Sequence, residues 1–248
     1  PQDVSYRQFL QLLSGRALSW MRYKIEALPA PLPADHPQLP VLLRAYKIAH
    51  ACSCLRGTTI PLESWLTPRL TADLAETVLR NAKSGRVGDL VLAARLIGAK
   101  AADDPALIAH LSALPGGDLR DRLVLDPTPD TLAEVETLLS AMIPVETLTD
   151  TRIDRFAGLV MQLYDYGASR PQLSSVSAYG DIFANCLHYA DWAQSKRRLA
   201  PLAQMIFCLC LIDPGHDVAP YIADIMSCQR PDGSFPEKLG YGTSDQGL

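Results

Sequence analysis

The sequence predicts an all-α protein of stacked antiparallel helical hairpins, and three observations support this fold class. Hydrophobic residues recur with helical spacing along almost the whole chain, and no stretch alternates convincingly with the period of two expected for a strand. Proline, glycine and aspartate divide the chain into pieces of helical length. About ten helices joined by short loops fit hairpin stacks better than a four-helix bundle, which uses fewer and longer helices.

The amino-terminal part of the chain predicts two long helices, at residues 5–28 and 41–55. Between them, residues 29–40 hold five prolines in twelve positions and are expected to form an extended connection. Gly57 is expected to end the second helix. Further helices are expected within residues 61–80 and near 86–98 and 104–114.

The carboxyl-terminal part is divided by Pro115-Gly116-Gly117 and by the proline-rich segment 126–130. Asp130 or Thr131 is expected to N-cap the helix that follows, since aspartate and threonine accept hydrogen bonds from the first backbone amides of a helix. The remaining helices are expected at residues 152–166, 178–194, 199–212 and 218–229.

We expect residues 1–248 to form a single all-helical domain, because a chain of 248 residues can bury a sufficient core without disulfides or metal. A weak internal duplication of residues 39–80 and 199–235 is a further prediction. Cys52-x-Cys54 followed by Trp65 recurs 156 positions later as Cys208-x-Cys210 followed by Tyr221. Repeated helical hairpins of this kind build solenoids and toroids.

The composition of the chain limits the classes of partner and the compartment that we expect. Charged residues make up 20% of the chain and the net charge is −4, so no basic excess favours nucleic acid. The longest apolar run, residues 199–212, is too short to span a bilayer. The six cysteines lie mostly in apolar helical contexts, as reduced buried cysteines do, which predicts a cytoplasmic protein.

The segment from Gln229 to Phe235 is the most specific motif. Pro231 presets φ for a turn, Gly233 tolerates a positive φ, Gln229 can hydrogen-bond into the turn, and Phe235 can pack beneath it. The pattern Gln-x3-Gly-x-Phe resembles the repeated QW motif of terpene cyclases and protein prenyltransferases. The resemblance implies an α/α toroid or solenoid-like stack. Residues 237–248 end where those families continue into another helix, so we expect that the ring is incomplete, that this end docks elsewhere, or that a longer protein was trimmed. The aspartate-rich cyclase motifs have no match, so no catalytic residue is transferred.

One candidate site lies on the helix at 178–194. Asp181, Asn185, His188 and Trp192 share a helical face, where His188 could act as an acid or base oriented by Asp181, with Asn185 and Trp192 contacting substrate. Alternatively, this face simply meets solvent.

A second candidate site lies on the helix at 41–55. Arg44, Lys47 and His50 recur every three residues, and Tyr46 precedes His50 by four. On an inner helix, His50 and Tyr46 would be catalytic, and Arg44 and Lys47 would bind an anionic or carbonyl substrate. On a peripheral helix, the two cations would be a solvent face.

We expect no metal and no cofactor. The two C-x-C pairs point their side chains in nearly opposite directions on a helix, and phosphate-loop and dinucleotide motifs are absent. A zinc site assembled from distant helices, as in the prenyltransferases resembled, stays the alternative.

Two functions follow from these observations. The first is a biosynthetic enzyme that uses an apolar cavity between helical hairpins for acid/base chemistry on an isoprenoid-like or other specialised-metabolite substrate. The second is a non-catalytic helical scaffold or accessory protein that binds a protein or peptide partner. A ligand-binding or sensor protein is a third reading.

Overall fold

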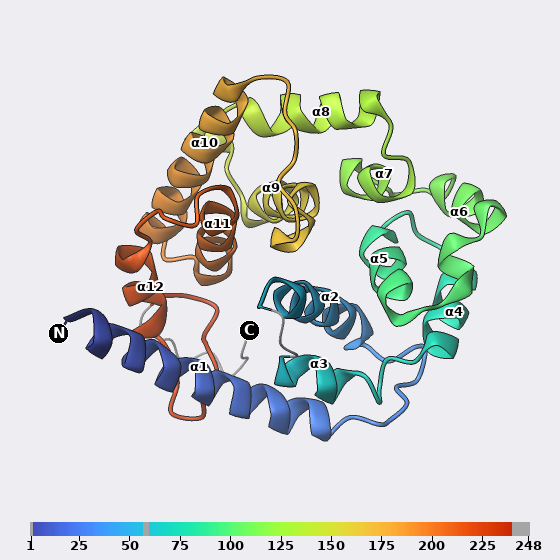
Figure 1. Cartoon of the computed structure of the whole chain (residues 1–248), viewed down its shortest axis with the longest axis horizontal. Helices are drawn as coiled ribbons and strands as arrows, with labels where there is room; N and C mark the ends of the chain where they lie inside the picture. Colours follow the sequence, from blue (N-terminus) through green and yellow to red (C-terminus); the bar gives the residue numbers. More distant parts are fainter. Residues whose placement is uncertain (1, 57–59, 240–248) are drawn as a thin grey trace. The chain divides into compact units, whose positions relative to one another are not determined.

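The computed structural model describes residues 2–56 and 60–239, and within these ranges it is all-helical, with twelve α-helices and no strand (Figure 1). The all-α prediction is therefore confirmed. The predicted end of the second helix at Gly57 lies outside the described residues. The helices are α1 Gln2–Glu26, α2 Leu39–Arg56, α3 Pro61–Leu66, α4 Ala72–Arg80, α5 Gly88–Ile97, α6 Pro105–Ser112, α7 Leu119–Leu125, α8 Pro129–Ser140, α9 Asp150–Leu163, α10 Val176–Ser195, α11 Leu199–Ile212 and α12 Ala219–Met226.

Local sequence explains most helix starts. Thr71 caps α4 by accepting from the Leu74 amide at 3.2 Å, and Ser175 caps α10 in the same way at Ala178. At α8 the prediction of Asp130 or Thr131 as the cap is wrong. Thr128 caps this helix, because its hydroxyl accepts from the Thr131 amide at 3.2 Å, and Asp130 lies in the first turn.

Three larger differences separate the predicted helices from the structure. The segment 61–80 contains two short helices, α3 and α4, separated by residues 67–71 with Pro68 among them. Pro40 lies inside the first turn of α2, where its missing amide costs nothing, so α2 begins within the predicted connection. Helix α7 was not predicted at all.

The chain divides into two compact units. Unit 1 comprises Pro1–Lys24, Leu139–Val160 and Leu173–Leu248, and unit 2 comprises Ile25–Leu138 and Met161–Gln172. Whether they form one domain, and whether 39–80 and 199–235 are duplicated, stay predictions.

Unit 1 has its core between α10 and α11, which pack together as a hairpin. Tyr189 is fully buried, its hydroxyl accepts from the Ile143 amide at 2.9 Å, and its ring meets the edge of Phe156 at 5.0 Å between centroids. Leu202 and Leu209 of α11 are fully buried as well. This hairpin fixes the position of α10, which carries one candidate site.

Unit 2 is organised around α5, which packs against α2, α4 and α7. Val91, Ala93 and Ala94 of α5 are completely buried, and the small alanine side chains let neighbouring helices approach closely. Gly98 ends the helix with φ 86°, the left-handed conformation that glycine adopts readily. The position of α5 next to α2 brings the second candidate site together with Asp89.

The turn at 230–234 has the predicted geometry. Gly233 has φ 95°, and the Gln229 side-chain amide donates to its carbonyl oxygen at 3.0 Å. The same amide donates to the Leu13 carbonyl oxygen of α1, also at 3.0 Å. Phe235 is half-buried. The turn therefore docks the end of the described chain onto the first helix of unit 1.

Candidate functional site

The four candidate residues of α10 share a helical face but differ in exposure. Asp181 is exposed, whereas Asn185 is 2% exposed and its side-chain amide donates to the Leu139 carbonyl oxygen at 2.8 Å. Asn185 thus ties α10 to the end of α8 inside unit 1.

His188 and Trp192 are half-buried on the same helix. The His188 ring lies 5.8 Å from the Tyr189 ring, and its Nε2 atom is buried without a hydrogen-bond partner. Among the described residues, no hydrogen bond or ion pair joins Asp181 to His188. The orienting role expected of Asp181 has no contact to support it, and catalysis by His188 stays a prediction.

On α2, the structure brings Arg44 and Lys47 together around Asp89 of α5. The Lys47 ammonium is 2.5 Å from Oδ1 of Asp89, and the Arg44 guanidinium is 3.6 Å from Oδ2. Lys47 is only 2% exposed, and its Nζ lies 4.4 Å from the centre of the Tyr166 ring. Both cations therefore already face a carboxylate of their own unit.

Burial sets the proton affinities in this cluster. It lowers the pKa of Lys47 despite the opposing attraction of Asp89. Burial alone would raise the pKa of Asp89, but Lys47 and Arg44 outweigh it and lower that pKa. Burial is the largest single influence on both groups, but around Asp89 the nearby cations together exceed it. We take the pair as ionised, with Lys47 the more destabilised member.

The other two α2 candidates form a second group. The rings of Tyr46 and His50 are stacked with centroids 6.3 Å apart. His50 Nδ1 is 3.0 Å from Oε1 of Glu63, and the Ser53 hydroxyl donates to Oε2 of Glu63 at 3.0 Å. A carboxylate that holds one ring nitrogen is the usual orienting partner of an acid/base histidine. The same contacts also fasten α3 to α2.

A cavity of about 260 Å³, partly open to solvent, lies in unit 2 between α5, α7, α8, the end of α9 and the segment after it. Its polar wall residues are Arg95, Gln162, Asp165 and Tyr166. The remainder of the wall is apolar and consists of Leu92, Leu123, Val124, Pro127, Leu132 and Leu163. Ligand cavities typically have this mixture of an apolar wall and few polar groups.

Tyr166 connects the cavity with the buried ion pair, since it lines the cavity and covers Lys47. Asp165, Tyr166 and Gly167 all have positive φ values, 47°, 53° and 101°. For the two non-glycine residues this conformation costs roughly 1–3 kcal/mol each, and such strain concentrates at functional sites. Burial, followed by the charge of Asp89, raises the pKa of Tyr166, so its phenol stays protonated at neutral pH.

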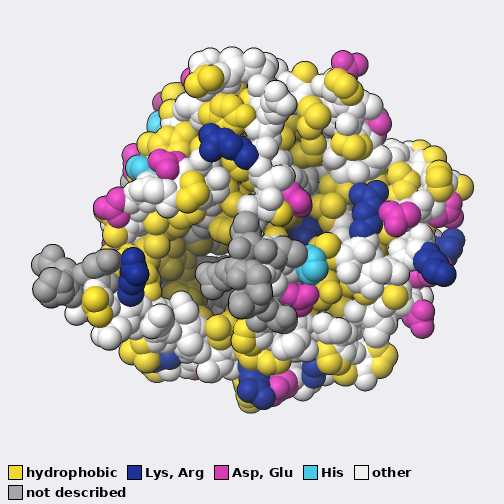
Figure 2. Space-filling model, in the orientation of Figure 1, with side chains coloured by type: hydrophobic (Ala, Val, Ile, Leu, Met, Phe, Trp, Pro, Cys, Tyr) yellow, Lys and Arg dark blue, Asp and Glu magenta, His cyan; other side chains and the backbone are white. Residues whose placement is uncertain are grey.

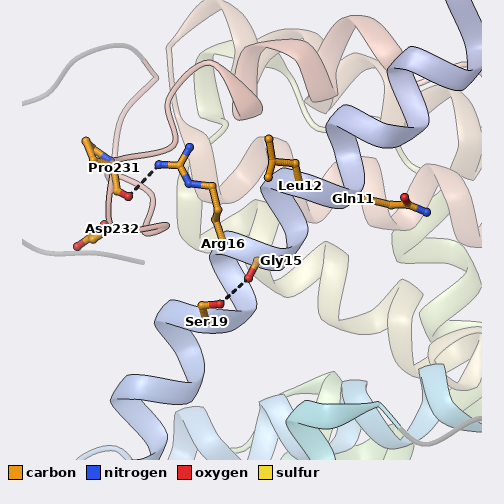
Figure 3. A pocket seen from close by; sticks show the side chains of 7 residues that line it. All are labelled: Gln11, Leu12, Gly15, Arg16, Ser19, Pro231 and Asp232. Atoms are coloured by element: carbon orange, nitrogen blue, oxygen red, sulfur yellow. Dashed lines mark hydrogen bonds between the residues drawn. The ribbon is translucent and has the colours of Figure 1, made fainter.

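A second, wider hollow of about 510 Å³ lies in unit 1 between α1 and the turn at Pro231, and its lining side chains are drawn in Figure 3. The Arg16 guanidinium donates to the Pro231 carbonyl oxygen at 2.8 Å, and the Ser19 hydroxyl donates to the Gly15 carbonyl oxygen at 3.0 Å. The Arg16 contact fastens the turn to α1 and gives the hollow a structural explanation, whereas the Ser19 contact lies within α1.

Sequence reasoning selected Arg44, Tyr46, Lys47 and His50 but missed their partners Asp89, Glu63 and Tyr166. None of the eight predicted site residues lines the unit 2 cavity. The segment Tyr164-Asp165-Tyr166-Gly167 carried a usable signal, because a glycine after a helix indicates a left-handed turn. The positions of Asp89 and Glu63 in the sequence give no indication that either residue contacts α2.

Several properties concern the whole described chain. Among the side chains that the structure describes, those of residues 4–53 and 60–239, no group of three or more could ligate a metal ion. Nor does any helix in these ranges have the length and apolarity to cross a membrane. Basic and acidic side chains are interspersed on the face shown in Figure 2. Comparison of the chain with family models, curated proteins and solved structures finds no match in any of the three.

Proposed function

We propose that this protein is a biosynthetic enzyme that acts by acid/base chemistry on a small, largely apolar molecule bound in the cavity of unit 2. An isoprenoid-like or other specialised metabolite has this character. The stacking of hairpins into an incomplete α/α toroid or solenoid is part of the proposal. Its support is a cavity with a mostly apolar wall and four polar residues.

The observation that carries the proposal is the conformation of Tyr166. Two successive non-glycine residues with positive φ hold this side chain between the cavity and the Lys47 ammonium. A turn with this energetic cost persists only where the surrounding packing enforces it. This conformation places a neutral phenol in the cavity wall, next to the Lys47–Asp89 ion pair.

The acid/base roles follow from the surroundings of each group. Tyr166 is protonated at neutral pH and is the group placed to donate a hydrogen bond to a bound molecule. Burial and the charge of Asp89 oppose ionisation of its phenol, so Tyr166 stays neutral while it donates. His50, with Glu63 on its ring nitrogen, is the second acid/base candidate of this unit.

Turnover by the purified protein tests the proposal. The wild type is incubated with a mixture of small neutral and weakly polar metabolites, and consumed and formed masses are followed by liquid chromatography and mass spectrometry. Tyr166→Phe should lower the rate at least tenfold, since it removes only the hydroxyl. Tyr23→Phe is the matched control, because Tyr23 is 72% exposed on α1. No turnover by the wild type, or equal rates for the two variants, would contradict the proposal.

One observation favours the scaffold function as a second candidate. Helix α1 exposes the large apolar side chains of Val4, Phe9, Leu12 and Tyr23, each at least half exposed. Such residues on one helix can contact a protein or peptide partner. If this is their role, Phe9→Ser with Leu12→Ser should abolish the association with a co-purifying protein. Val176→Ser, at a residue 88% exposed on α10, should leave it unchanged.

A further inference from the structure

We propose that the cavity of unit 2 selects an uncharged ligand. The ligand has roughly a dozen non-hydrogen atoms, because that number fills the cavity at the packing density of a protein interior. The inference rests on the proposed function and narrows its substrate class. It also replaces the anionic substrate expected from Arg44 and Lys47 with a neutral one.

The size of the cavity sets the first limit. Its volume of about 260 Å³ is slightly below the usual range for ligand cavities, about 300–1,000 Å³. The six apolar residues of its wall come from three helices, the end of a fourth, and the loop before α8. A compact hydrocarbon body with one small polar group fits such a wall.

The charges of the wall set the second limit. Its one cation, Arg95, lies 3.5 Å from the Asp103 carboxylate, and its one anion is the exposed Asp165. The two charged residues of the wall itself, Arg95 and Asp165, cancel. An ionic ligand would lose hydration on entering without a matching excess of opposite charge, which is costly.

The nearby buried charges do not change this balance. The Tyr166 ring lies between Lys47 and the cavity, 4.4 Å from the Lys47 ammonium. The ammonium itself is paired with Asp89. The Tyr166 ring therefore separates the ion pair from a ligand. An anion in the cavity would meet the phenol and not the ammonium.

Isothermal titration calorimetry with three probes of one skeleton tests the inference: 1-adamantanemethanol, 1-adamantanecarboxylate and 1-adamantanemethylammonium. The alcohol should bind at least tenfold more tightly than either ion. Leu123→Trp, which fills the cavity from α7, should abolish its binding. Met142→Trp, at a residue 62% exposed in unit 1, is the control and should bind normally.

Two conservative variants test the role of charge directly. Arg95→Met leaves Asp165 in the wall and should improve binding of the ammonium probe roughly two- to fivefold, the range of an exposed ion pair. Asp165→Asn should improve binding of the carboxylate by a similar factor. Asparagine tolerates the left-handed conformation at this position.

The outcomes separate the inference from the proposed function. If an ion binds as tightly as the alcohol and Leu123→Trp removes it, the ligand class is wrong and the cavity is still the site. If no probe binds while the wild type turns over a metabolite through Tyr166, the neutral class and size are wrong and the enzyme stands. If neither binding nor turnover occurs, both proposals fall.

Discussion

The side-chain amide of Gln229 donates a hydrogen bond to the backbone carbonyl oxygen of Leu13, 216 positions earlier in the chain, at 3.0 Å. The Arg16 guanidinium returns a contact from α1 to the Pro231 carbonyl oxygen. The first helix and the last described turn of unit 1 are therefore held together by side-chain donors from both segments. Stability measurements on this pair of segments test the structure independently of function.

Gly233 should be the least replaceable residue of the turn. A Cβ atom there would lie 2.2 Å from the Arg16 carbonyl oxygen, and φ is 95°. Gly233→Ala should lower the free energy of unfolding by about 3 kcal/mol or more, from steric overlap and backbone strain together. Gly98→Ala is the matched control, because φ is 86° but no atom lies within 4 Å, so it should cost about 1 kcal/mol. Equal losses in urea denaturation would contradict the close approach.

Gln229→Glu should destabilise unit 1 by about 2–3 kcal/mol, because it replaces the donor with a carboxylate facing the Leu13 and Gly233 carbonyl oxygens. Gln229→Met, which removes the donor without adding charge, should cost about half as much. Gln11→Glu on the exposed face of α1 is the control, with an expected change within about 0.5 kcal/mol. Thermal unfolding of the three variants measures this ranking.

Asp89→Asn should be strongly destabilising, by about 3 kcal/mol, because it leaves the ammonium of buried Lys47 without its carboxylate. In a Lys47→Met background the same change should cost much less, since no buried ammonium is left unpaired. A double-mutant cycle measures this coupling. Glu76→Gln breaks the exposed Arg80–Glu76 pair and should cost no more than about 0.5 kcal/mol. A zero coupling energy would argue against the buried ion pair.

Acid should weaken the protein partly through Asp89. Its pKa in the folded state lies below the ordinary value of 3.8, because Lys47 and Arg44 outweigh the effect of burial. The stability it contributes is therefore fully present above about pH 4 and is lost as the pH falls through the lowered folded-state pKa. Urea denaturation between pH 7 and pH 3 should show a shallower loss for Asp89→Asn than for the wild type. Some slope should persist, because hydrogen bonding by Arg120 lowers the pKa of Asp118 against its burial.

Helical periodicity was sufficient to predict the longer helices, since α11 has the predicted bounds 199–212 and α10 differs by one or two residues at its ends. It failed for α7, which has only seven residues between two proline- or glycine-rich segments. Its start depends on Asp118 and Asp121, whose carboxylates accept from the backbone amides of Arg120 and Asp118. Short helices held by capping carry little periodic signal.

The candidate site was less predictable for a different reason. The sequence identified the polar residues of α2, because they share one helix and helical spacing relates them. It could not identify Asp89, 42 positions beyond Lys47, since only the packing of α5 against α2 brings the two together. Asn185 shows the converse error. Spacing placed it on a polar face, but the Leu139 carbonyl oxygen holds it inside unit 1.

The order of segments in unit 1 has a consequence for biosynthesis on the ribosome. Leu13 emerges early, whereas its partner Gln229 is added 216 residues later, after the whole of unit 2. At a synthesis rate of about 5–20 residues per second, roughly 10 to 40 s pass between the synthesis of α1 and that of the turn that docks on it. All segments of unit 2 lie before Leu173, so the whole of unit 2 has been synthesised while α1 is still without its final contacts.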